Sequence, residues 1–207
     1  MCLILHKPAG ERVAAELIDA AAAFNRDGWG IMGWHPDGSE LIERHQQVDA
    51  DRIKRRLHEL RDAELCLHLR LRTRGSDAFE NGHPIKVSER FHLMHNGTLR
   101  LKARIPGRSD SWHFAVDLLR PLALNWPESL AHPSFVALVE AGLTPENKVV
   151  LLDTQARRLV FFNHRHGVEF EGLWLSSTRW IDRRQLALTH APQPQQKTYA
   201  AAELDFL

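Results

Sequence analysis

The sequence predicts a single mixed α+β domain, and three observations support this prediction. Short apolar segments typical of strands recur from the first residues to about residue 176, and segments with helical apolar spacing lie between them. The 207 residues match one large domain or two small ones. The chain contains neither an internal repeat nor a linker-like composition. One domain over 1–207 is therefore the simplest organisation, with a weakly patterned tail over 185–207.

The first half of the chain alternates predicted strands with helices. An alanine-rich composition favours the first helix, and an acidic N-cap residue, Asp49 or Asp51, begins the second. The turn sequence Asp37-Gly38 between two apolar segments predicts a β-hairpin. In order, the expected segments are a strand over 1–6, a helix over 11–24, strands over 29–34 and 40–45, a helix over 49–61, and strands over 65–71 and 91–95.

The second half is expected to hold two helices followed by three strands. The first helix begins after Ser109-Asp110 and should stop at Pro121, because proline disrupts a helix interior. A turn around 154–157 should join the first two strands. The remaining expected segments are a helix over 134–141 and strands over 148–153, 158–163 and 173–176.

Composition and charge exclude several classes of protein. With 27 Lys+Arg against 26 Asp+Glu the net charge is +1, and 43% hydrophobic with 26% charged residues is typical of a soluble globular protein. The longest apolar runs, such as 149–152, are far shorter than the roughly 20 residues of a membrane span. Two cysteines without a Cys-x-x-Cys motif make neither a disulfide framework nor a cysteine zinc site. We expect a cytoplasmic protein with no membrane role and no visible signal peptide.

Cys2 is the most unusual residue for chemistry. Removal of Met1 would leave a thiol and a free α-amine on one residue. The α-amine has an ordinary pKa of about 7.7–8.0, so it can accept the thiol proton near neutral pH. Cys2 would then supply both a nucleophile and a general base. The alternative is an apolar cysteine at the start of a strand.

Two further segments supply the polar groups that amide chemistry needs. Arg70 alternates with Leu69 and Leu71, so its guanidinium lies on the opposite strand face and could bind a carboxylate through two hydrogen bonds. Asn96-Gly97 offers a side-chain amide and an uncrowded backbone N–H, which together suit an oxyanion hole. Each feature alone is more often a solvated strand residue or a turn, but the combination is far less frequent by chance.

The sequence resembles the class II glutamine amidotransferase (glutaminase) domains of the N-terminal nucleophile hydrolases, closest to small stand-alone members with Asp-Gly-Trp-Gly. Weaker agreement comes from 81–85 and 109–110, and the shared blocks run from residue 1 to about 120. The motifs that carry the resemblance are Met1-Cys2, Asn25-Arg26-Asp27-Gly28-Trp29-Gly30-Ile31, His68-x-Arg70-x-x-Thr73-x-Gly75 and Phe91-His92-Leu93-Met94-His95-Asn96-Gly97-Thr98-Leu99.

This resemblance implies a fold, a reaction and residue roles. The fold would be a four-layer αββα sandwich, with two antiparallel sheets between helical layers. The reaction would be hydrolysis of the glutamine side-chain amide to glutamate and ammonia. Asp27-Gly28-Trp29-Gly30 would support the strand of the nucleophile. The site residues would be Cys2 as nucleophile, Asn96 and Gly97 as oxyanion hole, Arg70 for the substrate α-carboxylate, Asp110 for its α-ammonium, and Thr73 in the pocket wall.

Three functions remain open at this point. The chain could pass ammonia to a separate synthase chain, or hydrolyse a larger γ-glutamyl amide as a stand-alone enzyme. It could also be a catalytically silent domain that binds an amino acid or a partner. The joint presence of all the catalytic and substrate-binding residues favours an enzyme that acts on glutamine or a γ-glutamyl amide.

Metal, cofactor and nucleic-acid functions have weaker support. His164-x-His166 would place two imidazoles on one strand face, but no third ligand has a recognised spacing. His68, His83 and His95 are expected to be hydrogen-bonded structural residues. The basic segment 52–56 is surrounded by acidic residues and is interpreted as a solvated helix. We therefore expect no metal, no cofactor and no nucleic-acid partner.

Overall fold

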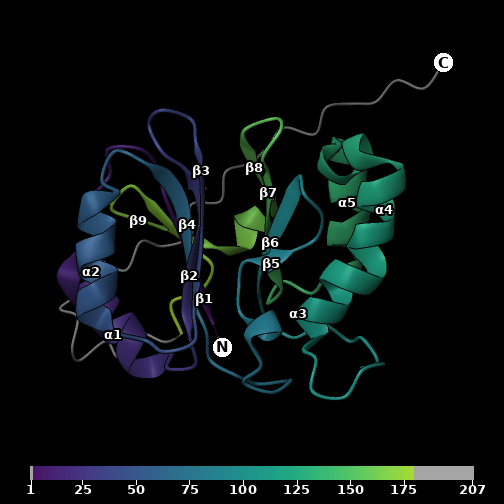
Figure 1. The fold of residues 1–207 in the computed structure, drawn as a ribbon, viewed down its shortest axis with the longest axis horizontal. Coiled ribbons are helices and arrows are strands. Elements are labelled where there is room, and N and C mark those ends of the chain that lie inside the picture. Colours follow the sequence, from purple (N-terminus) through teal and green to yellow (C-terminus); the bar gives the residue numbers. More distant parts are fainter. Residues whose placement is uncertain (1, 180–207) are drawn as a thin grey trace.

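The computed structural model describes residues 2–179, and these form two antiparallel sheets packed face to face with helices on both outer faces (Figure 1). The layer order is helix, sheet, sheet, helix, as the predicted αββα sandwich requires. The fold class is therefore confirmed. The expected tail over 185–207 lies outside the described residues.

The first sheet carries the N-terminal strand in its interior. Strand β1 pairs with β4 on one side and β10 on the other, with Leu3 opposite Leu69 and Leu5 opposite Leu175. The start of β1 therefore lies beside the ends of β4 and β10. In spatial order the strands are β3 (Glu40–His45), β2 (Trp29–Trp34), β4 (Glu64–Leu69), β1 (Leu3–Lys7), β10 (Leu173–Leu175) and β9 (Val168–Phe170).

The second sheet is smaller and comes from the middle of the chain. Its central pair, β6 and β7, aligns Asn96 with Lys148 at one end and Phe91 with Asp153 at the other. The short β5 and β9 were not expected from the sequence, because two or three residues are too few to show an alternating pattern. In spatial order the strands are β5 (Ile85–Lys86), β6 (Phe91–Asn96), β7 (Lys148–Asp153) and β8 (Arg158–Phe162).

Helices cover the outer face of each sheet. Asp49 caps α2, because its side chain accepts a hydrogen bond from the Arg52 N–H at 3.0 Å, as the sequence predicts. The first helix begins at Ala15, four residues later than expected. The helices are α1 (Ala15–Phe24) and α2 (Ala50–Glu59) over the first sheet, and α3 (Asp110–His113), the π-helical η2 (Phe114–Leu119), α4 (Arg120–Asn125) and α5 (Pro133–Gly142) over the second.

Two sequence expectations about local structure are wrong. The helix after Ser109 continues past Pro121 to Asn125, because a π-helical turn precedes the proline and Arg120 N–H bonds back to Ala115 O. Pro121 thus lies in the first turn of α4, where a missing N–H costs little. Residues 164–166 form the 3₁₀ turn η4 instead of a strand. The other 3₁₀ turns are η1 (Phe79–Asn81) and η3 (Pro127–Ala131).

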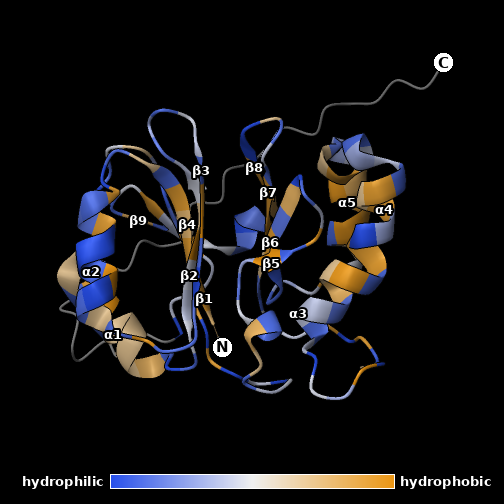
Figure 2. Ribbon diagram, in the orientation of Figure 1, coloured by the Kyte–Doolittle hydropathy of each residue, from blue (hydrophilic) through white to orange (hydrophobic). Residues whose placement is uncertain are grey.

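Three apolar clusters correspond to the three interfaces between the layers. One joins α1 and α2 to the first sheet, a second joins the helices over 110–142 to the second sheet, and a third fills the space between the sheets. Figure 2 shows α2 as largely hydrophilic, which fits a helix with one buried stripe. Within the described residues, no helix has the length and apolar character to cross a membrane.

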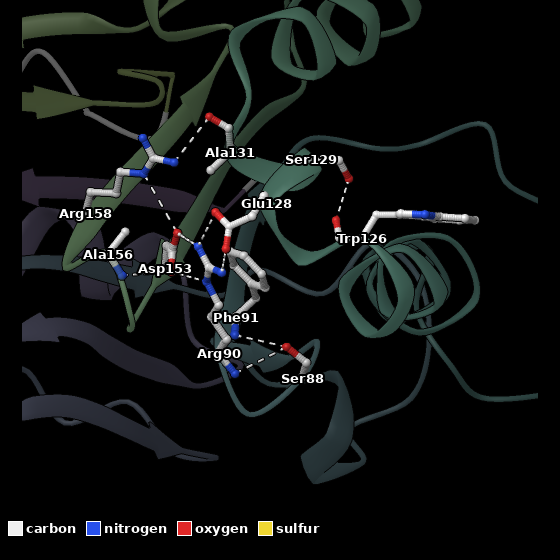
Figure 3. A network of polar contacts seen from close by, with 10 residues as sticks. All are labelled: Ser88, Arg90, Phe91, Trp126, Glu128, Ser129, Ala131, Asp153, Ala156 and Arg158. Atoms are coloured by element: carbon white, nitrogen blue, oxygen red, sulfur yellow. Dashed lines mark hydrogen bonds and ion pairs between the residues drawn. The ribbon is translucent and has the colours of Figure 1, made fainter.

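A buried ion pair holds the end of the second sheet opposite to Asn96 (Figure 3). Arg90 binds both carboxylate oxygens of Asp153, at 2.6 and 2.8 Å, and the Asp153 side chain is fully buried. Arg90 also binds the exposed Glu128 of η3. Burial alone would raise the pKa of Asp153, but hydrogen bonds from Arg90 and the Ala156 N–H outweigh it and lower the pKa. Arg90, Asp153 and Glu128 therefore link the turn before β6 to the end of β7 and to η3.

We predict that Asp153→Ala lowers the free energy of unfolding by roughly 3 kcal/mol, since it leaves a buried guanidinium without its main partner. Glu128→Ala, which removes the exposed partner, should cost less than about 1 kcal/mol. Urea unfolding at pH 7 measures both values. Because the folded pKa of Asp153 lies below its usual 3.8, its contribution is present above that pH and is lost as the pH falls through the folded pKa. Equal effects of the two variants would contradict the conclusion that Asp153 is the main partner of Arg90.

Candidate functional site

The site residues follow from the alternation of side chains along the strands. The layer between the sheets contains Ile4, Cys66, Met94, Val150 and Trp174. Alternate residues of a strand share a face, so continuing each strand by two-residue steps toward one end of the sandwich predicts the next inward-facing side chains. Those residues are Cys2 just before β1, His68 on β4, Arg70 just after β4, Asn96 on β6, Lys148 on β7 and Ser176 just after β10.

Cys2 lies against the segment that follows β4. Its thiol donates to Leu71 O at 3.4 Å, and its Sγ accepts from the Leu71 N–H at 3.3 Å. Burial raises the pKa of the Cys2 thiol; the Leu71 hydrogen bond and the positive charge of Arg70 lower it, and Asp110 raises it. The net upward shift means that the thiol stays protonated at neutral pH. A base is needed to make it a nucleophile.

Arg70 is held by both its backbone and its side chain. Its backbone N–H donates to Gly28 O at 2.8 Å, and its carbonyl accepts from the Asp27 N–H at 3.0 Å. Arg70 is only 6% exposed, and its guanidinium donates a hydrogen bond to Ser76 O at 2.9 Å. Asp27 also accepts from the Arg72 N–H at 2.7 Å. The Asp27-Gly28 segment thus holds Arg70 and Arg72, the two neighbours of the Leu71 that contacts the thiol.

Asn96 connects the two sheets at the same end. Its Nδ2 donates to Ser176 Oγ at 2.8 Å, and this oxygen also accepts from the Ile4 N–H at 2.8 Å. Asn96 Oδ1 is buried and has no hydrogen-bond partner in the described part of the chain. The amide is therefore fixed in orientation, with one of its two N–H groups held by Ser176.

Gly97 occupies a position that only glycine fits. Its φ is +139°, a value that other residues rarely adopt, and an added Cβ would lie 2.4 Å from Asn147 Oδ1. Asn147 Oδ1 is also 3.0 Å from His95 Nε2. Replacement of Gly97 would therefore displace Asn147 and the histidine that it contacts.

Asp110 borders a cavity of about 490 Å³. Its Oδ2 accepts from the Leu99 N–H at 2.6 Å, and its Oδ1 from the Ser111 N–H at 3.0 Å. Ser76, whose carbonyl binds the Arg70 guanidinium, lines the same cavity. Thr73 is exposed and is not one of the lining residues. Asp110 of α3 therefore borders the cavity directly, whereas Arg70 is not a lining residue and is linked to the cavity through its bond to Ser76.

Three buried histidines lie behind the site. His68 stacks on His83 with ring centroids 4.1 Å apart, and its Nε2 lies 3.2 Å from His95 O. His95 contacts Ser111 Oγ at 2.8 Å. Burial lowers the pKa of His68 to about 3, lowers that of His83 well below its usual 6.5, and lowers that of His95. The three rings are neutral at pH 7 and join β4, β6 and α3.

Sequence reasoning assigned no role to Ser176, Asn147 or Lys148. Ser176 and Lys148 could have been found from strand alternation, since each lies two residues from a residue between the sheets, Trp174 and Val150. Asn147 belongs to a turn and gives no periodic signal. In the part of the chain that the structure describes, no three His, Cys, Asp or Glu side chains gather as a metal site would require.

We predict that stability falls as the pH is lowered from 7 toward 5, because the unfolded chain binds protons at histidines that stay neutral when folded. The folded pKa of His83 lies below its usual 6.5, so its contribution is present above that pH and is lost on acidification. Each such histidine adds a slope of up to about 1.4 kcal/mol per pH unit. His83→Leu, which removes two buried ring nitrogens without partners among the described residues, should flatten the urea-unfolding profile. If His83→Leu has the same dependence of stability on pH as the wild type, His83 is not a source of that dependence.

The comparisons with known proteins find similarity among solved structures. No protein-family model matches the sequence, and no curated protein is significantly similar to it. Among solved structures, the chain is similar to a glutamine aminotransferase class-II domain protein from Silicibacter pomeroyi, with 16% identity and a TM-score of 0.37. The match covers 74% of this chain and 73% of that chain.

Proposed function

We propose that this protein is a class II glutamine amidotransferase-type amidohydrolase that uses Cys2 to hydrolyse the side-chain amide of glutamine or of another γ-glutamyl compound. The observation that carries the proposal is that the Cys2 sulfur is bound to the backbone of Leu71, directly after Arg70, while the charges of Arg70 and Asp110 both act on the pKa of the thiol. Asn96 is the last residue of β6 at the same end of the sandwich, and Gly97 follows it. The sequence motifs independently assign these same residues to such a site.

The charges suit the amino-acid end of a glutamine-like substrate. Arg70 would bind the α-carboxylate, and Asp110 would bind the α-ammonium in the cavity of about 490 Å³. The guanidinium has five N–H groups, and Ser76 O uses one of them, so donors remain for a carboxylate. Thr73 directly precedes Arg74 of the cavity wall, and its proposed contact with substrate is peripheral.

Nucleophilic attack would begin with a proton transfer within Cys2. Removal of Met1 leaves an α-amine on Cys2, which accepts the thiol proton. This base is needed because burial raises the pKa of the thiol. The thiolate then forms a bond to the amide carbon, and the carbonyl oxygen becomes an oxyanion that the Asn96 Nδ2 and the Gly97 N–H would stabilise.

Collapse of this intermediate completes the reaction in two steps. The C–N bond breaks as the Cys2 ammonium gives its proton to the leaving nitrogen, which releases ammonia from glutamine and leaves a thioester. Water then attacks the thioester, and glutamate leaves as Cys2 regains its thiol proton. A separate synthase chain would be the acceptor if the ammonia is not simply released.

The nucleophile can be tested with the two cysteines of the chain. Cys2→Ala should abolish ammonia release from glutamine, because no other group at the site can form the thioester. Cys66→Ala is the matched control, since Cys66 is fully buried between the sheets and should leave turnover largely intact. A coupled glutamate or ammonia assay measures both variants.

Processing of the N-terminus is tested on the same preparations. The intact mass of active protein should lack one methionine. Turnover by protein that retains Met1, or turnover by Cys2→Ala, would contradict the mechanism. Absence of turnover by processed wild-type protein on every γ-glutamyl amide would favour a silent binding domain.

Mutations of residues at the two ends of the substrate should have different effects on kcat and KM. Asn96→Ala should lower kcat by about 100-fold or more with a small change in KM, because the oxyanion forms only during the reaction. Arg70→Met should act mainly by raising KM, because the carboxylate is bound in both the ground and transition states. Steady-state kinetics on glutamine separates the two. An Asn96→Ala variant that changes KM alone would remove Asn96 from the oxyanion hole.

A further inference from the structure

A second cavity, of about 260 Å³, is lined by residues that follow β10 and by the start of β7. In the first sheet β1 lies between β4 and β10, so Cys2 at the start of β1 is flanked by Arg70 after β4 and Ser176 after β10. Ser176 lines the second cavity and holds the Asn96 amide at 2.8 Å. The first cavity is therefore connected to the site residues through Ser76 and Arg70 on the β4 side, and the second through Ser176 on the β10 side.

The second cavity is lined by more positive than negative charge. Lys148, directly opposite Asn96 in the β6–β7 pair, is 8% exposed, and its ammonium makes no hydrogen bond or ion pair with a residue that the structure describes. Arg179 is the other basic residue of the wall, and Glu146 is the carboxylate that offsets one of the two charges. With both cations charged, the wall carries a net charge of about +1. An anion would supply the partner that Lys148 lacks among residues 2–179.

Neutral donors surround this charge. Ser176 Oγ accepts from both Ile4 N–H and Asn96 Nδ2, so its own hydroxyl hydrogen remains to be donated. Thr178 adds a second hydroxyl to the wall. Burial lowers the pKa of His166, which also lines the cavity and is neutral at pH 7. Hydroxyl donors beside an ammonium and a guanidinium are a suitable set for a carboxylate or a similar oxyanion.

We propose that this cavity is the subsite for the leaving group of a γ-glutamyl amide whose amine portion carries a negatively charged group, such as a γ-glutamyl amino acid. The inference rests on the proposed function, because the glutamyl portion is assigned to Arg70 and to the cavity of about 490 Å³ that Asp110 borders. When the C–N bond breaks, the amine that takes up the proton departs on the Ser176 side with its anionic group held by Lys148 and Arg179. Glutamine, whose leaving group is ammonia, would leave this cavity unused.

A matched pair of substrates tests the charge requirement. γ-Glutamylglycine carries a carboxylate on its leaving group, and γ-glutamylglycinamide has nearly the same shape without the charge. We expect kcat/KM for γ-glutamylglycine to exceed that for the glycinamide by about ten-fold, the size of one charge-assisted hydrogen bond. Equal values for the two substrates would overturn the subsite.

Three variants test which residue recognises the carboxylate of the leaving group. Lys148→Met keeps the length of the side chain and removes its charge, so the ratio of the two kcat/KM values should fall toward one. Glu146→Gln removes the opposing carboxylate and should raise the ratio. Lys54→Met, on α2 and paired with Asp19 and Asp51, is the control and should leave the ratio unchanged. A Lys148→Met variant that lowers both kcat/KM values by the same factor would indicate a structural role and overturn the proposal.

Binding to Cys2→Ala separates failure of the subsite from failure of the proposed function. Calorimetric titration with each dipeptide should show the same preference for γ-glutamylglycine, and Lys148→Met in this background should remove it. Preferential binding without turnover by wild-type protein would reject the amidohydrolase and support the subsite. Turnover of both substrates without preference in either measurement would keep the amidohydrolase and reject the subsite.

Discussion

The Ser176 hydroxyl is the polar contact on which the arrangement of the candidate site depends. Its oxygen accepts from the Ile4 backbone in one sheet and from the Asn96 amide in the other, each at 2.8 Å. Apolar packing between the sheets is strong but not directional. Two hydrogen bonds to one buried oxygen supply the missing direction, and they fix the end of β6 relative to the start of β1. The relative positions of Cys2 and Asn96 follow from this contact.

Strand alternation made most of the fold predictable from the sequence. The hairpin over 29–45 and the strands over 148–153 and 158–162 were expected almost to the residue, because long apolar segments and a turn sequence mark their bounds. The helix past Pro121 was missed because a π-helical turn depends on packing against the second sheet, which no local pattern reports. The short strands β5 and β9 are likewise defined by their neighbours.

The candidate site was predictable residue by residue only where a motif carried it. Cys2, Arg70, Asn96, Gly97 and Asp110 came from motifs, and the structure brings them to one end of the sandwich. Thr73 came from the same motifs but is exposed, because the chain leaves β4 at Leu69 and the next residues follow the surface. The basic cavity could not be foreseen, since its walls come from segments that follow β10 and precede β7. Their proximity depends on how the two sheets pack, because β10 belongs to the first sheet and β7 to the second.

The contacts of the Cys2 thiol have a consequence for the rigidity of the site. Two hydrogen bonds to the Leu71 backbone hold the sulfur, and two backbone bonds to Asp27 and Gly28 hold Arg70 beside it. None of these four bonds uses the Arg70 guanidinium, and only the thiol bond to Leu71 O must break, when the thiol proton moves to the α-amine after the substrate has bound. Binding can therefore proceed without breaking the contacts that orient the nucleophile, so little ordering entropy is lost at that step. In these terms the nucleophile is preorganised by main-chain atoms, and its position tolerates changes in the side chain of residue 71.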